Sequence, residues 1–328
     1  WGRSDVGLMM PAAETKIRFI DRLEQAVRRR GTPALVGIDP HLDLLPPNVL
    51  PAEGPQRRLL PRQRLAAAVR EFCAGVLDVI GSMVPIVKFQ MAFFEQLGPE
   101  GMSALAELVG HARRYGLLVI LDGKRGDIGS TAVAYAEGML GPAPVSSWGG
   151  DAVTVSPYLG EDSLQPFIET AVARQGGVFV LVKTSNPGSG LFQDLIAEGM
   201  PLYRHVAAWV EQQAARTKGR CGYGDVGGVV GATFHEQLAE LRQVMPHTWF
   251  LVPGYGAQGG TARDVAAAFD PAGLGAIVNN SRGILFAYRR REFERFGPAR
   301  WQEAIEAATR EMIDQLRTDT PAGRLTSR

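Results

Sequence analysis

The chain has 328 residues, of which 45% are hydrophobic, so it suits one large globular domain and is not expected to be disordered throughout. Lys and Arg number 35 and Asp and Glu number 34, which leaves a net charge of +1. This balance excludes a global positive field of the kind that binds nucleic acid. Any site for an anion must therefore be local.

Metal, disulfide and membrane signals are all weak in this sequence. The two cysteines have no CxxC spacing and the five histidines are scattered without an HExxH motif, so we expect free thiols and no metal site. No apolar run reaches the roughly 20 residues of a membrane span. The N-terminus lacks the apolar segment of a signal peptide. We therefore expect no membrane partner and a cytoplasmic location.

Eight short apolar runs alternate with longer amphipathic stretches. They are rich in Val, Ile and Leu and show little polar alternation, which is typical of parallel strands buried on both faces. In chain order, the candidate strands are 34–39, 85–90, 117–122, 151–156, 177–184, 227–233, 249–254 and 275–281.

The stretches between these runs have helical periodicity. The clearest lie at 64–81, 102–116 and 202–218, and in the first of them apolar residues from Leu65 to Ile80 fall on one face. A last helix is expected around 299–317. A leading helix at about 14–30 precedes the first strand and could close the bottom of a barrel.

Strands that alternate with helices in this way predict either a (β/α)8 TIM barrel or a doubly wound sheet. A doubly wound dinucleotide-binding domain usually has a GxGxxG motif after its first strand. Here the first strand runs into Asp39-Pro40-His41, which favours the barrel. We expect a disordered or non-native tail at 1–13, a single barrel domain at 14–318 and a C-terminal tail at 319–328.

The segment 40–61, after the first strand, holds six prolines and cannot form a regular helix. One interpretation is a long ordered loop on the face where barrels keep their active sites. A solvated surface insertion is the alternative. The sequence does not decide between them.

Charged residues stand at or near the ends of successive predicted strands. They are Asp39 after the first strand, Lys88 in the second, and Asp122, Lys124 and Asp127 in and after the third. The fifth strand ends in Lys183-Thr184-Ser185-Asn186. Any one of these charges alone is better explained by a structural ion pair. Because strand ends converge in a barrel and buried charge is costly unless paired, the whole set predicts a functional site.

A phosphate site is the second signal. The loop after the seventh strand, PGYGAQGGTA at 253–262, has four glycines and can present backbone N–H groups to an anion. Arg282 stands beside Gly283 in the loop after the eighth strand. Loops after the seventh and eighth strands bind phosphate in many barrels, and an arginine can grip it with two hydrogen bonds.

The stretch LDGKRGDIGST resembles the D-x-K-x-x-D-I-x-x-T signature of orotidine 5'-phosphate decarboxylases, with Asp122, Lys124, Asp127, Ile128 and Thr131 at the matching positions. The resemblance extends over roughly residues 15–290. The stretches GIDPH, VKFQMAFFE, SPYLG, TSNPGSG and VPGYGAQGG carry it, and they are similar to the larger bacterial subgroup of that family.

The resemblance implies a cofactor-free carbon–carbon lyase that converts orotidine 5'-phosphate (OMP) to UMP in pyrimidine biosynthesis. Lys124 would donate the proton to C6, with Asp122 facing the substrate carboxylate. Lys88 would bridge Asp122 and the ribose, and Asp39 would bind a ribose hydroxyl.

The same resemblance implies how the rest of the substrate is held. Ser185 would bind the base and Pro253 would lie near the ring, while Gln258 and Arg282 would hold the phosphate. Asp127, Ile128 and Thr131 would reach the site of a partner subunit, which makes the expected assembly a homodimer.

Two alternatives stay open at this point. One is a barrel enzyme acting on another phosphorylated sugar, such as a hexulose-phosphate synthase, which shares D-x-K-x-x-D but needs Mg²⁺. The other is a UMP-binding barrel that has lost catalysis. The presence of Asp39, Lys88, Asp122, Lys124 and Asp127 together argues against the second alternative.

Overall fold

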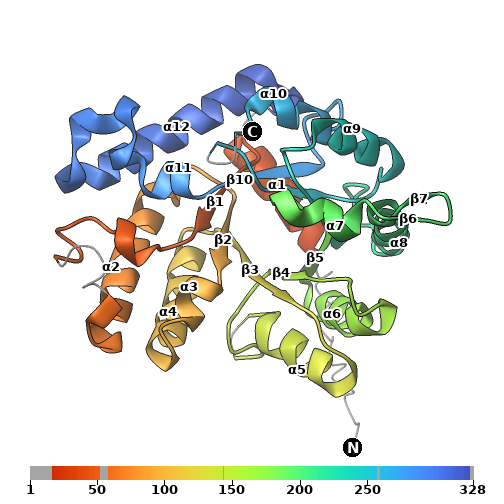
Figure 1. The fold of residues 1–328 in the computed structure, drawn as a ribbon, viewed down its shortest axis with the longest axis horizontal. Helices are drawn as coiled ribbons and strands as arrows, with labels where there is room; N and C mark the ends of the chain where they lie inside the picture. The colour runs from red at the N-terminus through yellow and green to blue at the C-terminus, as the bar shows by residue number, and fades with distance from the viewer. Residues whose placement is uncertain (1–16, 52–57, 143, 257–258, 326–328) are drawn as a thin grey trace, which may run out of the picture.

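Eight parallel strands close into a barrel in the order β1-β10-β9-β8-β5-β4-β3-β2, with helices around them (Figure 1). The computed structural model describes residues 17–51, 58–142, 144–256 and 259–325. The barrel strands are β1 (Ala34–Ile38), β2 (Ile86–Gln90), β3 (Leu118–Arg125), β4 (Ala152–Val155), β5 (Gly177–Lys183), β8 (Val226–Val230), β9 (Phe250–Val252) and β10 (Ala276–Asn280). The predicted (β/α)8 barrel is confirmed.

The strands lie where the apolar runs predicted them. The runs are apolar because both faces of each strand are covered. All residues of β1, β4, β8, β9 and β10 are buried, with the barrel interior on one side and the helices on the other. A strand with two buried faces needs apolar residues at nearly every position. The few polar residues in these strands are therefore informative, and they recur in the functional site.

The helices surround the barrel, and each expected helix has an observed counterpart. The leading helix, expected from about residue 14, begins at Phe19, and residues 14–16 lie outside the described ranges. The helices are α1 (Phe19–Arg30), α2 (Arg62–Ile80), α3 (Ala92–Glu95), α4 (Pro99–Arg114), α5 (Gly129–Met139), α6 (Glu161–Arg174), α7 (Gly190–Gln193), α8 (Leu202–Arg216), α9 (His235–Val244), α10 (Ala262–Val265), α11 (Arg282–Leu285) and α12 (Trp301–Asp319). On the buried face of α2, the ring of Phe72 stacks on Phe286 at 5.7 Å and packs against Trp301 at 4.9 Å. Burying a side chain of this size stabilises the fold by about 1.5–3 kcal/mol.

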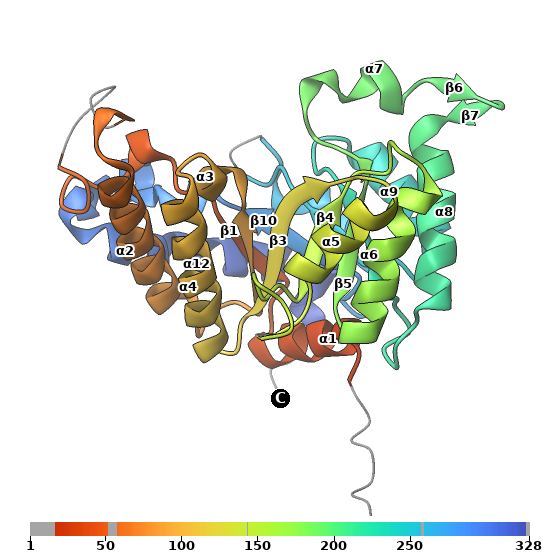
Figure 2. The same cartoon turned by 90° about the horizontal axis from the view of Figure 1, so that it is seen from below.

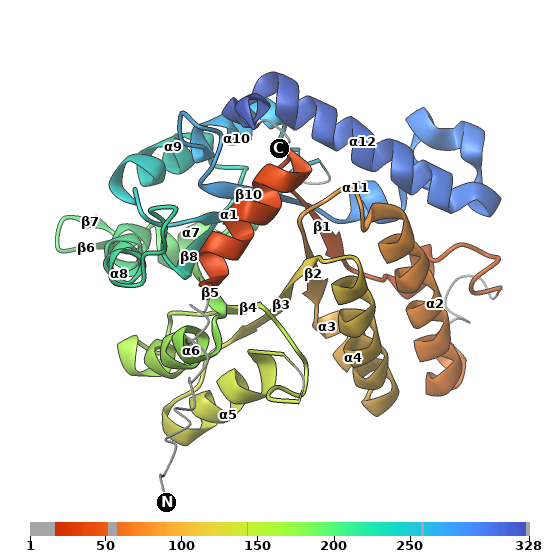
Figure 3. The same ribbon diagram turned by 180° about the vertical axis from the view of Figure 1, so that it is seen from behind.

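Helix α1 covers the end of the barrel at which the strands begin, as the sequence predicted (Figures 2 and 3). Phe19 packs on the first residue of β5, Gly177, where a β-carbon would approach the Phe19 ring to 2.2 Å. Arg18 and Arg22 bind Asp225 and Asp151 at 2.9 and 2.8 Å. Because these carboxylates directly precede β8 and β4, α1 closes the bottom and leaves the opposite end for a site.

The proline-rich segment is described over residues 40–51 and 58–61, and its first part is ordered. It contains a short 3₁₀ helix, η1 (Leu42–Leu44), and it buries Leu45 and Leu50. The carbonyl of Leu44 accepts a 2.7 Å hydrogen bond from the Tyr288 hydroxyl. Residues 52–57 lie outside the described residues. Up to residue 51, the ordered-loop interpretation holds and the solvated insertion does not.

The last described residues pack onto the barrel. Helix α12 runs to Asp319 and is followed by the 3₁₀ helix η8 (Pro321–Arg324), which buries Ala322, with Leu325 buried after it. These residues belong to the segment expected as a tail at 319–328. Residues 1–16 lie outside the described ranges. None of the helices within those ranges is both long and apolar enough to cross a membrane.

Candidate active site

A cavity of about 430 Å³ opens at the carboxyl ends of the strands. Its polar lining comes from nearly every strand of the barrel. The lining includes Asp39, Lys88, Gln90, Asp122, Lys124, Thr154, Thr184, Ser185, Asn186, Gln193, Tyr255, Asn279, Ser281 and Arg282. Leu181, Val229, Leu251 and Pro253 supply an apolar wall. This mixture suits a ligand with one flat apolar part and several polar groups.

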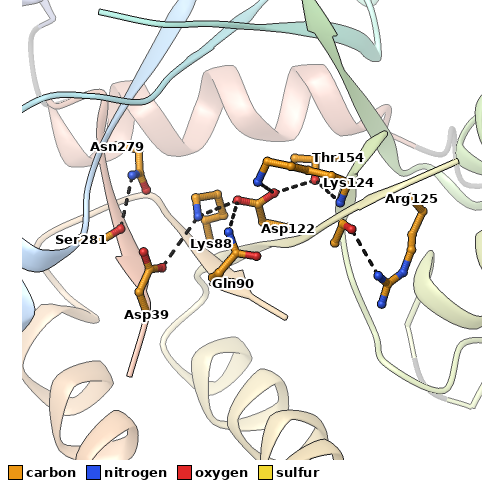
Figure 4. A network of polar contacts seen from close by, with 10 residues as sticks. Asp39, Lys88, Gln90, Asp122, Lys124, Arg125, Thr154, Asn279 and Ser281 are labelled. Atoms are coloured by element: carbon orange, nitrogen blue, oxygen red, sulfur yellow. Dashed lines mark hydrogen bonds and ion pairs between the residues drawn. The ribbon is translucent and has the colours of Figure 1, made fainter. Parts of the chain in front are cut away.

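Asp122 lies at the centre of a polar network (Figure 4). One carboxylate oxygen is 2.7 Å from Lys124 Nζ and accepts a 2.7 Å hydrogen bond from the Thr154 hydroxyl. The other is 2.9 Å from Lys88 Nζ and accepts a 3.2 Å bond from the Gln90 amide. Lys88 is also 3.9 Å from Asp39. The structure thus brings together the four charges that the sequence predicted to converge, in alternating sign.

The alternation of charge determines the protonation states. Burial alone would raise the pKa of Asp122, but Lys88 and then Lys124 outweigh it and hold that pKa well below its usual value. Burial likewise disfavours the ammonium of Lys88, yet Asp122 and Asp39 raise its pKa above the ordinary value. Both groups are therefore ionised at neutral pH. Removing one partner of such a buried pair typically costs about 3–5 kcal/mol, so these charges depend on one another.

Lys124 is held by an unusual backbone conformation. Its φ angle is +45°, and the pairing of β3 with β4 shifts register between Leu121 and Arg125. The freed N–H of Lys124 donates a 3.0 Å bond to the Thr154 hydroxyl. A non-glycine residue in this region carries about 1–3 kcal/mol of strain, and a bulge re-aims its side chain. The Lys124 side chain is 46% exposed while that of Asp122 is 7% exposed, so the ammonium stands between the buried carboxylate and the cavity.

Two buried oxygen atoms in the cavity have no hydrogen-bond partner within the described part of the chain. They are Oδ1 of Asp39 and Oδ1 of Asn279. The amide nitrogen of Asn279 donates to Ser281 at 3.3 Å, which leaves its oxygen free to accept. A buried acceptor without a partner is costly, so both atoms suit hydroxyl donors of a ligand.

The remaining predicted site residues fall into three groups. Ser185, Pro253 and Arg282 line the cavity. Gln258 lies outside the described residues. Asp127, Ile128 and Thr131 do not line the cavity of their own chain. Asp127 accepts a 2.8 Å bond from the N–H of Ile128, which is 57% exposed, and Thr131 is exposed on α5.

Sequence reasoning missed several residues that line the cavity. Thr154 and Asn279 are polar residues inside apolar strand runs, and that signal could have found them. Gln90 ends β2 only two residues after Lys88. Gln193 stands in an exposed segment far from any predicted strand, and no feature of the sequence marks it. Within the described ranges, no group of three or more His, Cys, Asp or Glu side chains is placed to hold a metal ion.

Comparisons with known proteins agree with one another. A profile described as the orotidine 5'-phosphate decarboxylase / HUMPS family matches residues 60–295. The orotidine 5'-phosphate decarboxylase of Rhodopirellula baltica is 51% identical over 302 residues, which cover 91% of this chain and 99% of that one. Leishmania donovani OMP decarboxylase is 32% identical with a TM-score of 0.69, and the match covers 92% and 98% of the two chains. Leishmania donovani UMP synthase is 33% identical with a TM-score of 0.71, but this chain covers 57% of its length.

Proposed function

The chain belongs to the orotidine 5'-phosphate decarboxylase family, lyases that convert OMP to UMP in the last step of pyrimidine nucleotide biosynthesis, and we propose that Lys124 is the proton donor of this reaction. The observation that carries the proposal is the Asp39–Lys88–Asp122–Lys124 network at the mouth of the barrel. In this network each carboxylate lies beside an ammonium group and each ammonium group beside a carboxylate, so opposite charges stabilise one another. The cytoplasmic location remains a prediction.

The reaction breaks the bond between C6 of the pyrimidine and its carboxylate. CO₂ leaves, the electron pair stays on C6, and Lys124 Nζ–H supplies the proton that completes UMP. Lys124 then regains a proton from water. The ammonium stabilises the negative charge that develops on C6 before it transfers the proton, so one group performs both tasks. Asp122, ionised beside the substrate carboxylate, favours the loss of that negative group.

Lys88 and Asp39 hold the ribose in this proposal. The side chain of Lys88 is 5% exposed and lies between Asp122 and Asp39, so it can hold both carboxylates in place. Oδ1 of Asp39, which is 3.9 Å from Lys88 Nζ, and Oδ1 of Asn279 receive no hydrogen bond from the described part of the chain, so both can accept one from a ribose hydroxyl. These contacts fix the sugar, and through it they place C6 over Lys124.

Base and phosphate are held by the loops after β5, β9 and β10. Ser185 binds the base and Pro253 contacts the ring; both line the cavity, and Pro253 belongs to its apolar wall. Arg282 begins the short helix α11 and binds the phosphate, with Gln258 as its expected second partner. The phosphate is remote from C6, so its binding energy serves to position the reacting atoms.

A homodimer completes each site in this proposal. Asp127, Ile128 and Thr131 do not line the cavity of their own chain, and α5 exposes Val133 and Tyr135 beside them. An apolar, exposed helix face next to a polar signature suits a contact with a second copy. Asp127 of one protomer then enters the cavity of the other.

Mixing two inactive variants tests this arrangement. Lys124→Ala and Asp127→Ala are each expected to be nearly inactive, while a hybrid dimer has one site that lacks both groups and one intact site. Random pairing makes half of the dimers hybrids, so co-expressed chains should recover about a quarter of the parental kcat. As the control, Lys124→Ala mixed with Asp122→Asn should stay inactive, because both residues serve the same site. No recovery in the first mixture would mean that Asp127 acts within its own chain or not at all.

The activity itself is tested with OMP in the presence of EDTA, followed by pyrimidine absorbance. We expect rapid conversion to UMP, since no step above requires a metal ion. A protein that is inert until Mg²⁺ and another sugar phosphate are supplied belongs to the hexulose-phosphate type of reaction. A protein that binds UMP but converts neither substrate is a binding barrel.

A further inference from the structure

Lys183, the last residue of β5, is a buried cation that does not line the active-site cavity. Its side chain is 0% exposed, and its ammonium is 2.5 Å from Asp194 Oδ1. The rings of Phe234 and Tyr203 face the ammonium at 4.7 and 5.4 Å. A fully enclosed lysine is rare unless it is paired, so the ion pair with Asp194 and the two rings are what stabilise the ammonium here.

A local irregularity turns Lys183 away from the barrel interior. Leu181 lines the cavity, and simple strand alternation would point Lys183 the same way two residues later. The pairing of β5 with β8 shifts register between these two residues, so both Leu181 and Lys183 pair with neighbouring residues of β8. Such a bulge redirects the side chain that follows it. The expectation that Lys183 shares the site with Thr184, Ser185 and Asn186 is therefore wrong for Lys183 alone.

The partner of Lys183 lies on a projecting segment that we call the arm, residues 184–201. The arm contains α7 and a hairpin of β6 (Ile196–Ala197) and β7 (Met200–Pro201), and it rises above the open end of the barrel (Figure 2). Its large apolar side chains, Leu191, Phe192, Leu195 and Ile196, are exposed. Apolar burial therefore does little to hold α7 in place, and its polar contacts matter more.

The polar contacts of α7 include residues that line the cavity. Gln193, the neighbour of Asp194, accepts a 2.9 Å bond from the backbone N–H of Thr184 and donates a 2.8 Å bond to the Thr184 hydroxyl. Gln193 and the run 184–186 all line the cavity. The ion pair between Lys183 and Asp194 thus fixes the end of α7. Gln193 at that end then holds residues 184–186, which border the base, through its bonds to Thr184.

We propose that Lys183 and Asp194 anchor the arm and thereby position Gln193 and residues 184–186 for substrate binding. Both are positioning residues, because neither lines the cavity where the reaction occurs. The inference rests on the proposed function in one respect: the ligand that the segment holds is the pyrimidine nucleotide.

Lys183→Met is the variant of choice, since methionine can pack against Phe234 and Tyr203 while Asp194, 46% exposed, stays solvated. We expect KM for OMP to rise about tenfold or more with kcat nearly unchanged, because binding is loosened and the Lys124 network is intact. Gln193→Ala should give a similar rise in KM.

The double variant, with Lys183→Met and Gln193→Ala, should have a KM no higher than that of either single variant, because Lys183 acts through Gln193. Arg70→Met, which removes the 2.8 Å surface ion pair with Glu107, is the matched control and should leave KM unchanged.

A second readout does not need activity. The amide of Thr184 is protected by Gln193, so its hydrogen exchange should become about tenfold faster in Lys183→Met and in Gln193→Ala, but not in Arg70→Met. An unchanged KM and unchanged exchange in Lys183→Met, or effects that multiply in the double variant, would overturn the anchor. If Lys183→Met does not fold, Asp194→Asn tests the same pair and leaves a neutral acceptor for the ammonium. A parent protein that is inactive on OMP overturns the proposed function, and the exchange rates still decide about the anchor.

Discussion

Lys124→Ala is expected to lower kcat for OMP decarboxylation by about 10⁴-fold or more. A positioned general acid contributes about 10²–10⁴-fold, and removal of a preorganised group that stabilises developing charge costs a further 10²–10³-fold. Lys124 supplies both effects in the proposed mechanism, because its ammonium lies 2.7 Å from Asp122 and faces the cavity. The measurement is single-turnover conversion of OMP to UMP at saturating enzyme.

The matched control for this variant is Lys218→Ala, which removes an exposed lysine outside the cavity and should leave kcat within about twofold of the parent. Thermal unfolding of Lys124→Ala checks that the protein still folds. Asp122 keeps its contacts with Lys88, Thr154 and Gln90, so the network should survive. A kcat within tenfold of the parent would remove Lys124 from the role of proton donor.

Orotidine, which lacks the phosphate, is expected to react with a kcat/KM at least about 10³-fold lower than that of OMP. In the proposed mechanism the phosphate is distant from C6, and its binding energy serves to place the ring over Lys124. The decarboxylation chemistry is the same in both substrates. Equal kcat/KM values for OMP and orotidine would contradict a positioning role for the phosphate.

Arg282→Ala tests whether Arg282 is the residue that binds the phosphate. With OMP, kcat/KM should fall about tenfold to a hundredfold, the usual effect of losing a charge-assisted hydrogen bond. With orotidine, the same variant should behave like the parent, because the arginine has no phosphate to bind. A fall of similar size with both substrates would place the contribution of Arg282 in the fold or in the base site.

Much of the fold could be predicted because each signal is local. An apolar run of six residues without polar alternation is typical of a strand with two covered faces, and a parallel sheet wrapped by helices provides them. Once the barrel is predicted, parallel strands require that their carboxyl ends meet at one rim. For that reason, Asp39, Lys88, Asp122 and Lys124 could be placed in one site although 84 residues lie between the first and the last.

The tertiary structure alone decided the details that depend on neighbouring strands. Strand alternation points Lys183 into the cavity, but a bulge against β8 turns it outward to Asp194. A bulge against β4 gives Lys124 its positive φ. A register shift follows from the pairing of two distant segments, so neither segment's own pattern encodes it.

What the sequence by itself determined is therefore the order of the strands and helices, the barrel that their alternation and the missing GxGxxG motif favoured, and the charged groups at its rim. What only the tertiary structure decided is where those groups point and which neutral residues complete the site. Thr154 and Gln193 act through hydrogen bonds to Asp122 and Thr184. Such bonds depend on directions and distances of about 3 Å, which are set only when segments far apart in the chain pack together.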